Sequence, residues 1–418
     1  MKKLIGVFTL VFLTTSSYAI TADGLKELID RRALDLVAEK ALVEKQELSA
    51  RATWRSYFPT LSLSAGVTEF YPYQTFNSKS WNQEYSLGIS LTATPLDLKK
   101  NVQLKVDRYF IKVSKDNLKA VKLNLYYEGL STLFKLKALK EKIEIRKKIL
   151  KDSEEILSVA KKKYREGLVL ITDVLKAESE VERARSSVTE AQMEYSQLFN
   201  SLNELVDYAL PEGETPEVEL KKDFPLPLEK ELLKKAFTLR PELKKASREL
   251  KVARLNVELQ EKTLSPSLNL SVSYSRSGTS FLPEDNLYNL SLSLNFPVFD
   301  SGVTRFRSMA LEKELLVKEV ELKKVRNAIR TEVLNALQAL RASRDILKSS
   351  ESSLKFARKS YKRAFNEYKL GVSDIVALLQ AHESLKEAEE AYVDALLNFN
   401  LSLLQLQKAT GELLGGRK

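Results

Sequence analysis

Few residues of this chain could support covalent or metal chemistry. The 418-residue sequence contains no cysteine and a single histidine, His382. Without thiols, and with one imidazole, the sequence excludes the common zinc, haem and iron–sulfur sites and most histidine-based catalysis. No nucleophile motif, metal-ligand spacing or phosphate-binding glycine loop is present, so we predict no catalytic, cofactor-binding or metal-binding residue. His382 lies in a predicted helix, where we expect it at a surface position.

Charged residues are numerous and mixed in sign. Lys and Arg total 67 and Asp and Glu total 56, which gives a formal net charge of +11. A basic balance can indicate nucleic acid or an anionic surface as partner. Here the two signs are interspersed along the chain, as on solvated helix faces. A nucleic-acid binder would need clustered cations with base-stacking aromatic residues, so we disfavour that alternative.

The N-terminus has the pattern of a secretory signal peptide. Two lysines precede a short apolar run, and Ser17 and Ala19 are small residues at the positions that a signal peptidase reads. We therefore predict a signal peptide over residues 1–19. No later stretch has the 18 or more consecutive apolar residues of a membrane-spanning helix.

The rest of the chain is an internal repeat. The stretch at 57–64 recurs at 264–271, and Gly167 followed by Ala177 recurs as Gly371 followed by Ala381. A proline-rich stretch between the copies indicates a linker. The predicted divisions are a first repeat (20–209), a linker (210–228), a second repeat (229–413) and a tail (414–418).

Each repeat is predicted to hold a helix, two strands and two long helices. In the first repeat these are a helix at 22–55, strands at about 60–70 and 83–94, and helices at about 97–166 and 171–208. In the second they are a helix at 228–263, strands at about 267–277 and 286–297, and helices at about 302–369 and 373–412. Gly167 and Gly371 are expected to separate the two long helices of each repeat.

The strand segments alternate between apolar and small polar residues. Leu61, Leu63 and Val67 share one face of the first strand, and serine and threonine share the other. Aromatic residues gather near the strand ends, as in the interfacial girdles of membrane barrels (Trp54, Tyr57, Phe58, Phe70, Tyr71, Tyr73, Phe76 and Trp81). A soluble, half-buried sheet would show the same alternation. Within a bilayer, however, an open sheet edge is not tolerated, and four strands cannot close a barrel. Several chains would therefore have to contribute strands to one barrel, and a trimer would supply twelve.

The helices after the two glycines carry a heptad pattern. Apolar residues follow one another at spacings of 3 and 4, first from Val174 to Leu205 and again from Leu378 to Phe399. This 3.5-residue period is typical of coiled coils. A rod-like coiled-coil scaffold would explain these helices, but it would not explain the strands.

The duplicated order of elements resembles the TolC family of outer-membrane efflux proteins. The resemblance rests on the stretch from Gly167 to Leu175, on a Tyr-x-x-Gly turn in both repeats, and on Pro-Ser/Thr-Leu strand starts. It implies a mainly α fold with membrane β-structure, completed as a homotrimer with a twelve-stranded β-barrel and a twelve-helix α-barrel. It also implies the outer membrane as location, and a periplasmic adaptor and an inner-membrane transporter as partners.

The resemblance further implies that the two helix turns form the closed periplasmic end of a passive exit duct. In that family, polar contacts hold this end shut, and Asp173 and Tyr368 match its latch aspartate and tyrosine. The residues implied for the tip, its gating and its adaptor contact are Tyr164, Gly167, Asp173, Tyr368, Gly371 and Ser373. Asp173 fits equally well as an acidic residue that favours a helix N-terminus.

The sequence departs from the family pattern in two respects. Ser373 stands where a latch arginine is expected, and Ala377 and Gln380 stand where an acidic pair lines the aperture. The closed state must then be held differently, and strong cation selectivity is not expected. The function implied is an exit duct for efflux or type I secretion that is not an enzyme, with a periplasmic coiled-coil scaffold as the alternative.

Overall fold

The computed structural model describes residues 20–70, 82–211 and 215–415. The predicted signal peptide, the aromatic residues Tyr71, Tyr73, Phe76 and Trp81, and the last three residues of the tail lie outside these ranges. The chain forms two compact units. Unit 1 comprises Met1–Val37, Val121–Leu239 and Arg330–Lys418, and unit 2 comprises Ala38–Ala120 and Arg240–Ile329.

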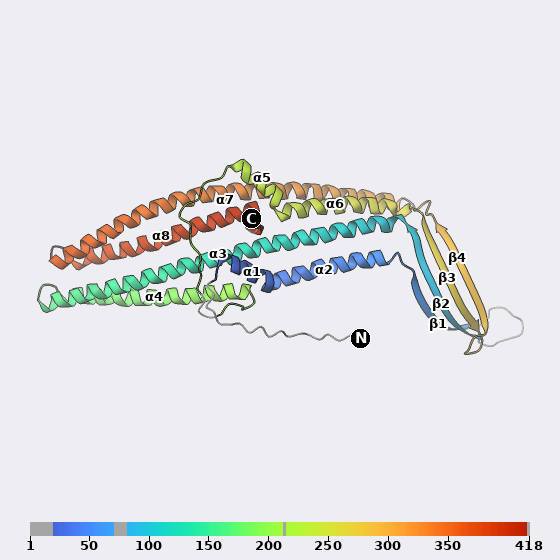
Figure 1. Ribbon diagram of the computed structural model, residues 1–418, viewed down its shortest axis with the longest axis horizontal. Helices are drawn as coiled ribbons and strands as arrows, with labels where there is room; N and C mark the ends of the chain where they lie inside the picture. The colour runs from blue at the N-terminus through green and yellow to red at the C-terminus, as the bar shows by residue number, and fades with distance from the viewer. Residues whose placement is uncertain (1–19, 71–81, 212–214, 416–418) are drawn as a thin grey trace. The chain divides into compact units, whose positions relative to one another are not determined.

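Unit 2 contains an antiparallel sheet of four strands in the order β1-β2-β3-β4 (Figure 1). The strands are β1 (Thr60–Phe70), β2 (Asn82–Asp97), β3 (Ser267–Gly278) and β4 (Asp285–Asn295). β2 continues past Pro95, beyond the predicted end at 94, because a register shift between Ala93 and Leu96 accommodates the proline. Within the described residues, β1 and β4 each have one edge without a partner strand.

The strand register collects apolar side chains on one face of the sheet. Leu61 pairs with Leu91, Leu91 with Val272, and Val272 with Leu290. One residue along, a polar row runs through Ser62, Ser90, Ser273 and Asn289 on the opposite face. The apolar row is open to the surroundings of a single chain, since Leu61 is 65% exposed and Leu290 is 74% exposed. The alternation therefore produces one apolar and one small polar face across all four strands.

The two long helices that follow the strand pairs start at aspartates. α3 (Leu98–Arg165) begins after Asp97, whose Oδ1 accepts hydrogen bonds from the backbone N–H groups of Lys99 (2.9 Å) and Lys100 (3.2 Å). α7 (Val303–Leu370) begins after Asp300, whose Oδ2 accepts from the N–H of Thr304 at 2.7 Å. These bonds satisfy N–H groups that have no partner within the helix.

The single helices predicted at 22–55 and 228–263 are wrong, because each is divided. The first consists of α1 (Ala22–Arg32) and α2 (Leu34–Arg55), and the second of α5 (Glu229–Leu239) and α6 (Pro241–Glu261), with a 3₁₀ turn at Lys262–Leu264. Pro241 occupies the first position of α6, because its ring and missing N–H forbid a helix interior. Ala33 adopts nearly the same backbone angles (φ −57°, ψ 118°) as Arg240 (φ −57°, ψ 120°), so the two repeats break at matching places.

Unit 1 is built around two helical hairpins. α3 turns into α4 (Ile171–Leu205), and α7 turns into α8 (Ile375–Thr410), as Figure 1 shows. The heptad residues of α4 and α8 are buried or half-buried, as expected for a coiled-coil seam. No helix among the described residues is both long and apolar enough to cross a membrane.

Two buried asparagines hold the irregular segment between the repeats. Asn203 exchanges two hydrogen bonds with the backbone of Leu210, at 2.8 and 3.1 Å. Asn400 does the same with the backbone of Lys221, at 2.8 and 2.9 Å. The segment is thus attached to α4 and α8 without forming a strand or a helix of its own in its described part.

Candidate tip and gating site

The turns between α3 and α4 and between α7 and α8 contain the same hydrogen-bonded motif. The N–H of Leu168 bonds to the carbonyl of Lys163 at 2.9 Å, and the N–H of Gly167 bonds to that of Tyr164 at 3.0 Å. The second turn repeats this pattern, from Val372 to Glu367 and from Gly371 to Tyr368. Both glycines have positive φ, of +71° and +79°, which favours glycine over residues with a Cβ. These motifs satisfy the last carbonyls of α3 and α7.

The helices that leave the turns begin differently in the two repeats. α4 follows Leu170, which makes no side-chain cap. α8 follows Asp374, whose carboxylate accepts a hydrogen bond from the N–H of Ala377 at 2.8 Å. Asp374 is not among the predicted tip residues, although an aspartate directly before an apolar helix is a recognisable start signal. Ser373 precedes this cap, half-buried and outside the helix.

A hydrophobic cluster joins all four helices next to the turns. It contains Ile156 and Ala160 of α3, Ala177 of α4, Tyr368 of α7, and Ile375 and Leu378 of α8. Tyr368 is among the largest fully buried side chains of the described residues, with 1% of its surface exposed. Its counterpart in the first repeat, Tyr164, is 45% exposed. The two repeats therefore differ at this position, and only Tyr368 belongs to the core.

Asp173 and Tyr368 lie in the same region but make no hydrogen bond. Burial raises the pKa of the Tyr368 hydroxyl, and the charge of Asp173 raises this pKa further. The hydroxyl oxygen of Tyr368 has no hydrogen-bond partner among the described residues. The contact that Tyr368 does make comes from Lys163, whose Nζ donates to the main-chain oxygen of Tyr368 and lies 4.4 Å from its ring centroid.

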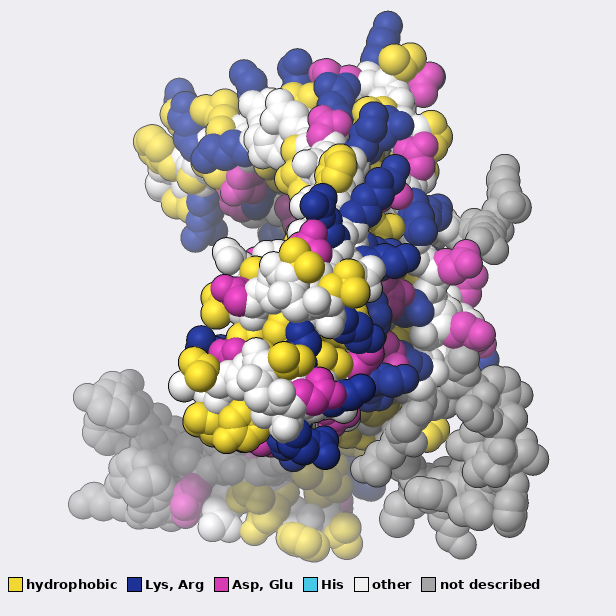
Figure 2. Space-filling view, turned by 90° about the vertical axis from the view of Figure 1, so that its left-hand side faces the viewer, with side chains coloured by type: hydrophobic (Ala, Val, Ile, Leu, Met, Phe, Trp, Pro, Cys, Tyr) yellow, Lys and Arg dark blue, Asp and Glu magenta, His cyan; other side chains and the backbone are white. Residues whose placement is uncertain are grey.

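Apolar side chains protrude from both turns. Leu168 and Leu170 of the first turn are 68% and 71% exposed, and Leu370 and Val372 of the second are 79% and 78% exposed. Figure 2 looks onto this end, where apolar side chains (yellow) lie among many Lys and Arg side chains (dark blue). On α8, Ala377 and Gln380 are also exposed, so within a single chain neither touches the core. Such an apolar end is typical of a surface that contacts a partner.

The expected surface position of His382 is wrong. Its side chain is 1% exposed, and its ring centroid lies 5.2 Å from that of Tyr361 on α7. The heptad of α8 alone places residue 382 beside the seam, and the covering helix α7 comes from elsewhere in the sequence. His382 Nε2 has no hydrogen-bond partner among the described residues. Burial lowers the pKa of His382 to about 4, although Glu383 and Glu389 oppose this shift and Lys386 and Lys148 add to it.

Acidification should therefore weaken unit 1 through His382. The unfolded chain binds a proton near pH 6.5 and the folded chain only near pH 4, so stability falls as pH drops through this window. Between pH 7 and pH 4 the loss should be about 3 kcal/mol per chain. Thermal unfolding of the helices, followed by circular dichroism at several pH values, measures it. His382→Phe should remove this part of the pH dependence, and an identical pH profile in the variant would contradict the assignment.

Charged side chains tie the helices together further along unit 1. Arg146 of α3 bonds Glu390 of α8 through Nε at 2.9 Å and Nη2 at 3.3 Å. Its Nη1 donates to the carbonyl of Ser187 on α4 at 2.9 Å. Beside it, the 3% exposed Glu389 accepts from Arg358 and Lys148. Arg146 thus connects three helices at one point.

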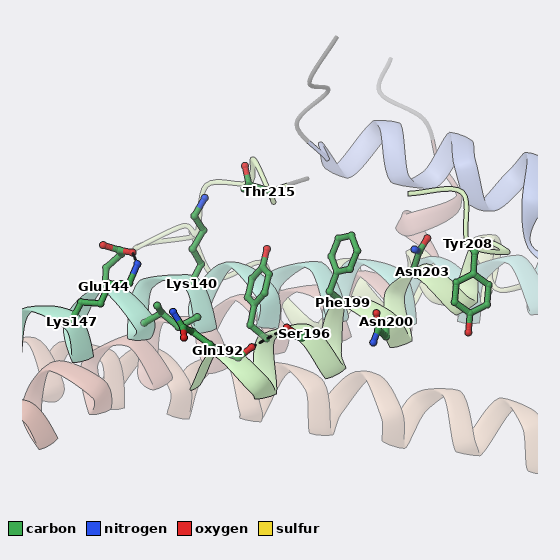
Figure 3. Close-up of a pocket in the computed structure, with 12 residues that line it drawn as sticks. Lys140, Glu144, Lys147, Gln192, Ser196, Phe199, Asn200, Asn203, Tyr208 and Thr215 are labelled. Atoms are coloured by element: carbon green, nitrogen blue, oxygen red, sulfur yellow. Dashed lines mark hydrogen bonds and ion pairs between the residues drawn. The ribbon is translucent and has the colours of Figure 1, made fainter. Parts of the chain in front are cut away.

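A groove of about 690 Å³ also opens along α3 and α4 (Figure 3). Lys140, Glu144 and Lys147 line it from α3, and Tyr195 and Phe199 line it from α4. No residue predicted for the tip lies in this groove. Among the described residues, no group of three or more His, Asp or Glu side chains could hold a metal ion.

Comparison with known proteins agrees with this architecture. The chain is 22% identical over 426 residues to TtgC, a toluene efflux pump outer-membrane protein of Pseudomonas putida, covering 95% of this chain and 86% of that one. It is 29% identical over 307 residues to CyaE of Bordetella pertussis, covering 72% and 63%. The crystal structure of CusC matches the fold with a TM-score of 0.82 at 16% identity, covering 96% and 95%.

The family match covers both repeats and leaves out the linker between them. Residues 25–206 and 232–412 match the family described as outer membrane efflux protein. These ranges include all four strands, both hairpins and both turns. The chain therefore belongs to the outer membrane efflux protein family, and its role is that of an outer-membrane exit channel.

Proposed function

We propose that three copies of this chain assemble into one passive duct. The observation that carries the proposal is the sheet, which within the described ranges has four strands, two unpaired edges and an exposed apolar face. An open sheet edge is not tolerated within a bilayer, and four strands cannot close a barrel. β1 and β4 have 11 residues each, which suits a tilted membrane-spanning strand. Pairing β4 of one chain with β1 of the next closes a twelve-stranded barrel.

The duct works with a periplasmic adaptor and an inner-membrane transporter. The exposed apolar residues at the turns support an adaptor contact at this end, which includes Tyr164, Gly167 and Gly371. The chain itself catalyses no reaction, so the inner-membrane transporter supplies the energy. Adaptor binding shifts the population of tips from closed to open.

The remaining tip residues contribute to closing the duct or to lining its aperture. Tyr368 and Asp173 belong to the closed arrangement, and Ser373 takes the place of the family's latch arginine. Ala377 and Gln380 line the aperture, where neutral side chains give no strong preference for cations. A periplasmic coiled-coil scaffold remains disfavoured, because it does not explain the exposed apolar face of the sheet.

Membrane fractionation tests this function. The full-length chain is expressed in a Gram-negative host, and the outer-membrane fraction is run unboiled and boiled on a denaturing gel. We expect a heat-sensitive band at three times the mass of the mature chain, and N-terminal sequencing should begin at Ile20 after loss of residues 1–19. A periplasmic monomer or dimer would refute the membrane duct.

A further inference from the structure

Lys163 is the only lysine among the buried residues of the described chain. Its surface is 9% exposed, although lysine is rarely buried unless it is paired. No carboxylate of the described residues lies within ion-pair distance of its ammonium group. Its partners are the main-chain carbonyl of Tyr368 and the face of the Tyr368 ring. Both contacts reach across from α3 to α7.

These contacts connect the two turns directly. The carbonyl of Lys163 accepts the N–H of Leu168 in the first turn motif, while its side chain reaches Tyr368. The carbonyl of Tyr368 also accepts the N–H of Gly371 in the second turn motif. Lys163 therefore joins the end of one hairpin to the end of the other from the core, in addition to the exposed ion pair between Lys369 of α7 and Glu155 of α3 at 3.3 Å. In the second repeat the matching residue is Glu367, which is paired with the exposed Arg363 instead.

We propose that Lys163 is the residue that holds the tip closed in this protein, in place of the arginine that Ser373 replaces. The inference rests on the proposed function, since it names the closing contact of the proposed duct. Ser373 has a short neutral side chain and cannot supply a cation, whereas Lys163 supplies one from the opposite hairpin. Asp173 then acts on this site through its charge, without a hydrogen bond to Tyr368.

The contact between Lys163 and Tyr368 also allows the tip to open. The ammonium group of Lys163 loses its hydration in the closed tip, and the carbonyl and the aromatic ring of Tyr368 compensate for this loss with only a small surplus. When α3 and α7 separate, water hydrates Lys163 again. The closed and open arrangements therefore differ little in free energy, and a partner that binds the turns can shift the balance.

Single-channel conductance of the purified full-length protein in a planar bilayer tests the inference. Lys163→Met keeps the length of the side chain but removes the charge and the donor, and it should raise mean conductance about fivefold or more. Lys163→Arg preserves both contacts and should conduct like the wild type. Lys162→Met is the matched control, because Lys162 is the exposed neighbour on the same helix and its loss changes the tip charge equally.

The outcomes separate the inference from the function on which it rests. Unchanged conductance of Lys163→Met, with the heat-sensitive trimer intact, would overturn the role of Lys163 and leave the duct in place. An equal rise with Lys162→Met would also overturn it, since tip charge alone would then explain the effect. If Lys163→Met does not assemble, Lys163→Gln is judged by the same criterion. A wild type that forms neither trimer nor channel would instead refute the proposed function.

Discussion

Replacing Tyr368 by alanine should destabilise the tip of unit 1 by about 3–5 kcal/mol, the usual loss for a large buried aromatic side chain. Tyr368 is 1% exposed and belongs to a cluster that joins all four helices. Its loss also removes the ring beneath Lys163. Trypsin cleavage at the lysines ending α3 should become about 100-fold faster or more, because cleavage requires local opening.

Tyr164→Ala is the matched control for stability. Tyr164 occupies the same position in the first repeat but is 45% exposed, so its loss should change stability by no more than about 0.5 kcal/mol. Tyr368→Phe separates packing from hydrogen bonding. The Tyr368 hydroxyl has no hydrogen-bond partner in the described part of the chain, so its removal should be neutral or slightly stabilising. Equal cleavage rates in both alanine variants would contradict the placement of Tyr368 in the core.

Removing Arg146 should cause the other large loss. Arg146 and Glu390 keep 19% and 20% of their side-chain exposure, so Arg146→Met leaves a largely buried carboxylate without its bidentate partner. The expected loss is about 3 kcal/mol, at the low end for buried pairs because some water still reaches the site. The midpoint of thermal unfolding, measured by circular dichroism at a fixed scan rate, should fall accordingly.

A second variant distinguishes the pair from general damage to the helices. Arg146→Met combined with Glu390→Leu replaces both charges with apolar groups and should recover most of the lost stability. Arg185→Met is the control, since Arg185 and Glu182 form an exposed pair on α4 at 3.6 Å that contributes less than about 1 kcal/mol. A double variant as unstable as Arg146→Met would mean that the interaction with Ser187 dominates.

Local patterns predicted much of the fold. Strict alternation located the strands, the heptads identified the buried faces of α4 and α8, and the glycines marked the turns. These features depend on residues that are close in sequence, so one sequence suffices to find them. Pro241 is an equally local signal for the break between α5 and α6, although the predicted helix at 228–263 runs through it. The break at Ala33 has no such signal, because no proline or glycine adjoins it.

Contacts between distant segments were not predictable in this way. His382 lies beside the seam of α8, and it is the packing of α7 that buries it. Lys163 belongs to a run of three lysines, and nothing in the run shows that one of them points towards Tyr368, about 200 residues later. The tip residues were predicted from the family resemblance, which implies the correct region but also a latch arginine that this chain lacks. The contact between Lys163 and Tyr368 became visible only with the fold.

The sharing of strands between chains can be tested with introduced cysteines, because the chain has none of its own. Ser64→Cys on β1 is combined in turn with Asn289→Cys, Ser291→Cys or Ser293→Cys on β4, so that one combination matches the register between chains. Within a chain, β1 and β4 are three strand spacings apart, roughly 14 Å, which is too far for a disulfide.

Oxidised outer membranes are then run boiled on a non-reducing gel. For at least one combination, we expect covalent dimers and trimers that disappear on reduction, because β4 of each chain lies beside β1 of the next. Boiled samples that contain only monomer for all three combinations, from membranes where the protein is present, would contradict the shared barrel.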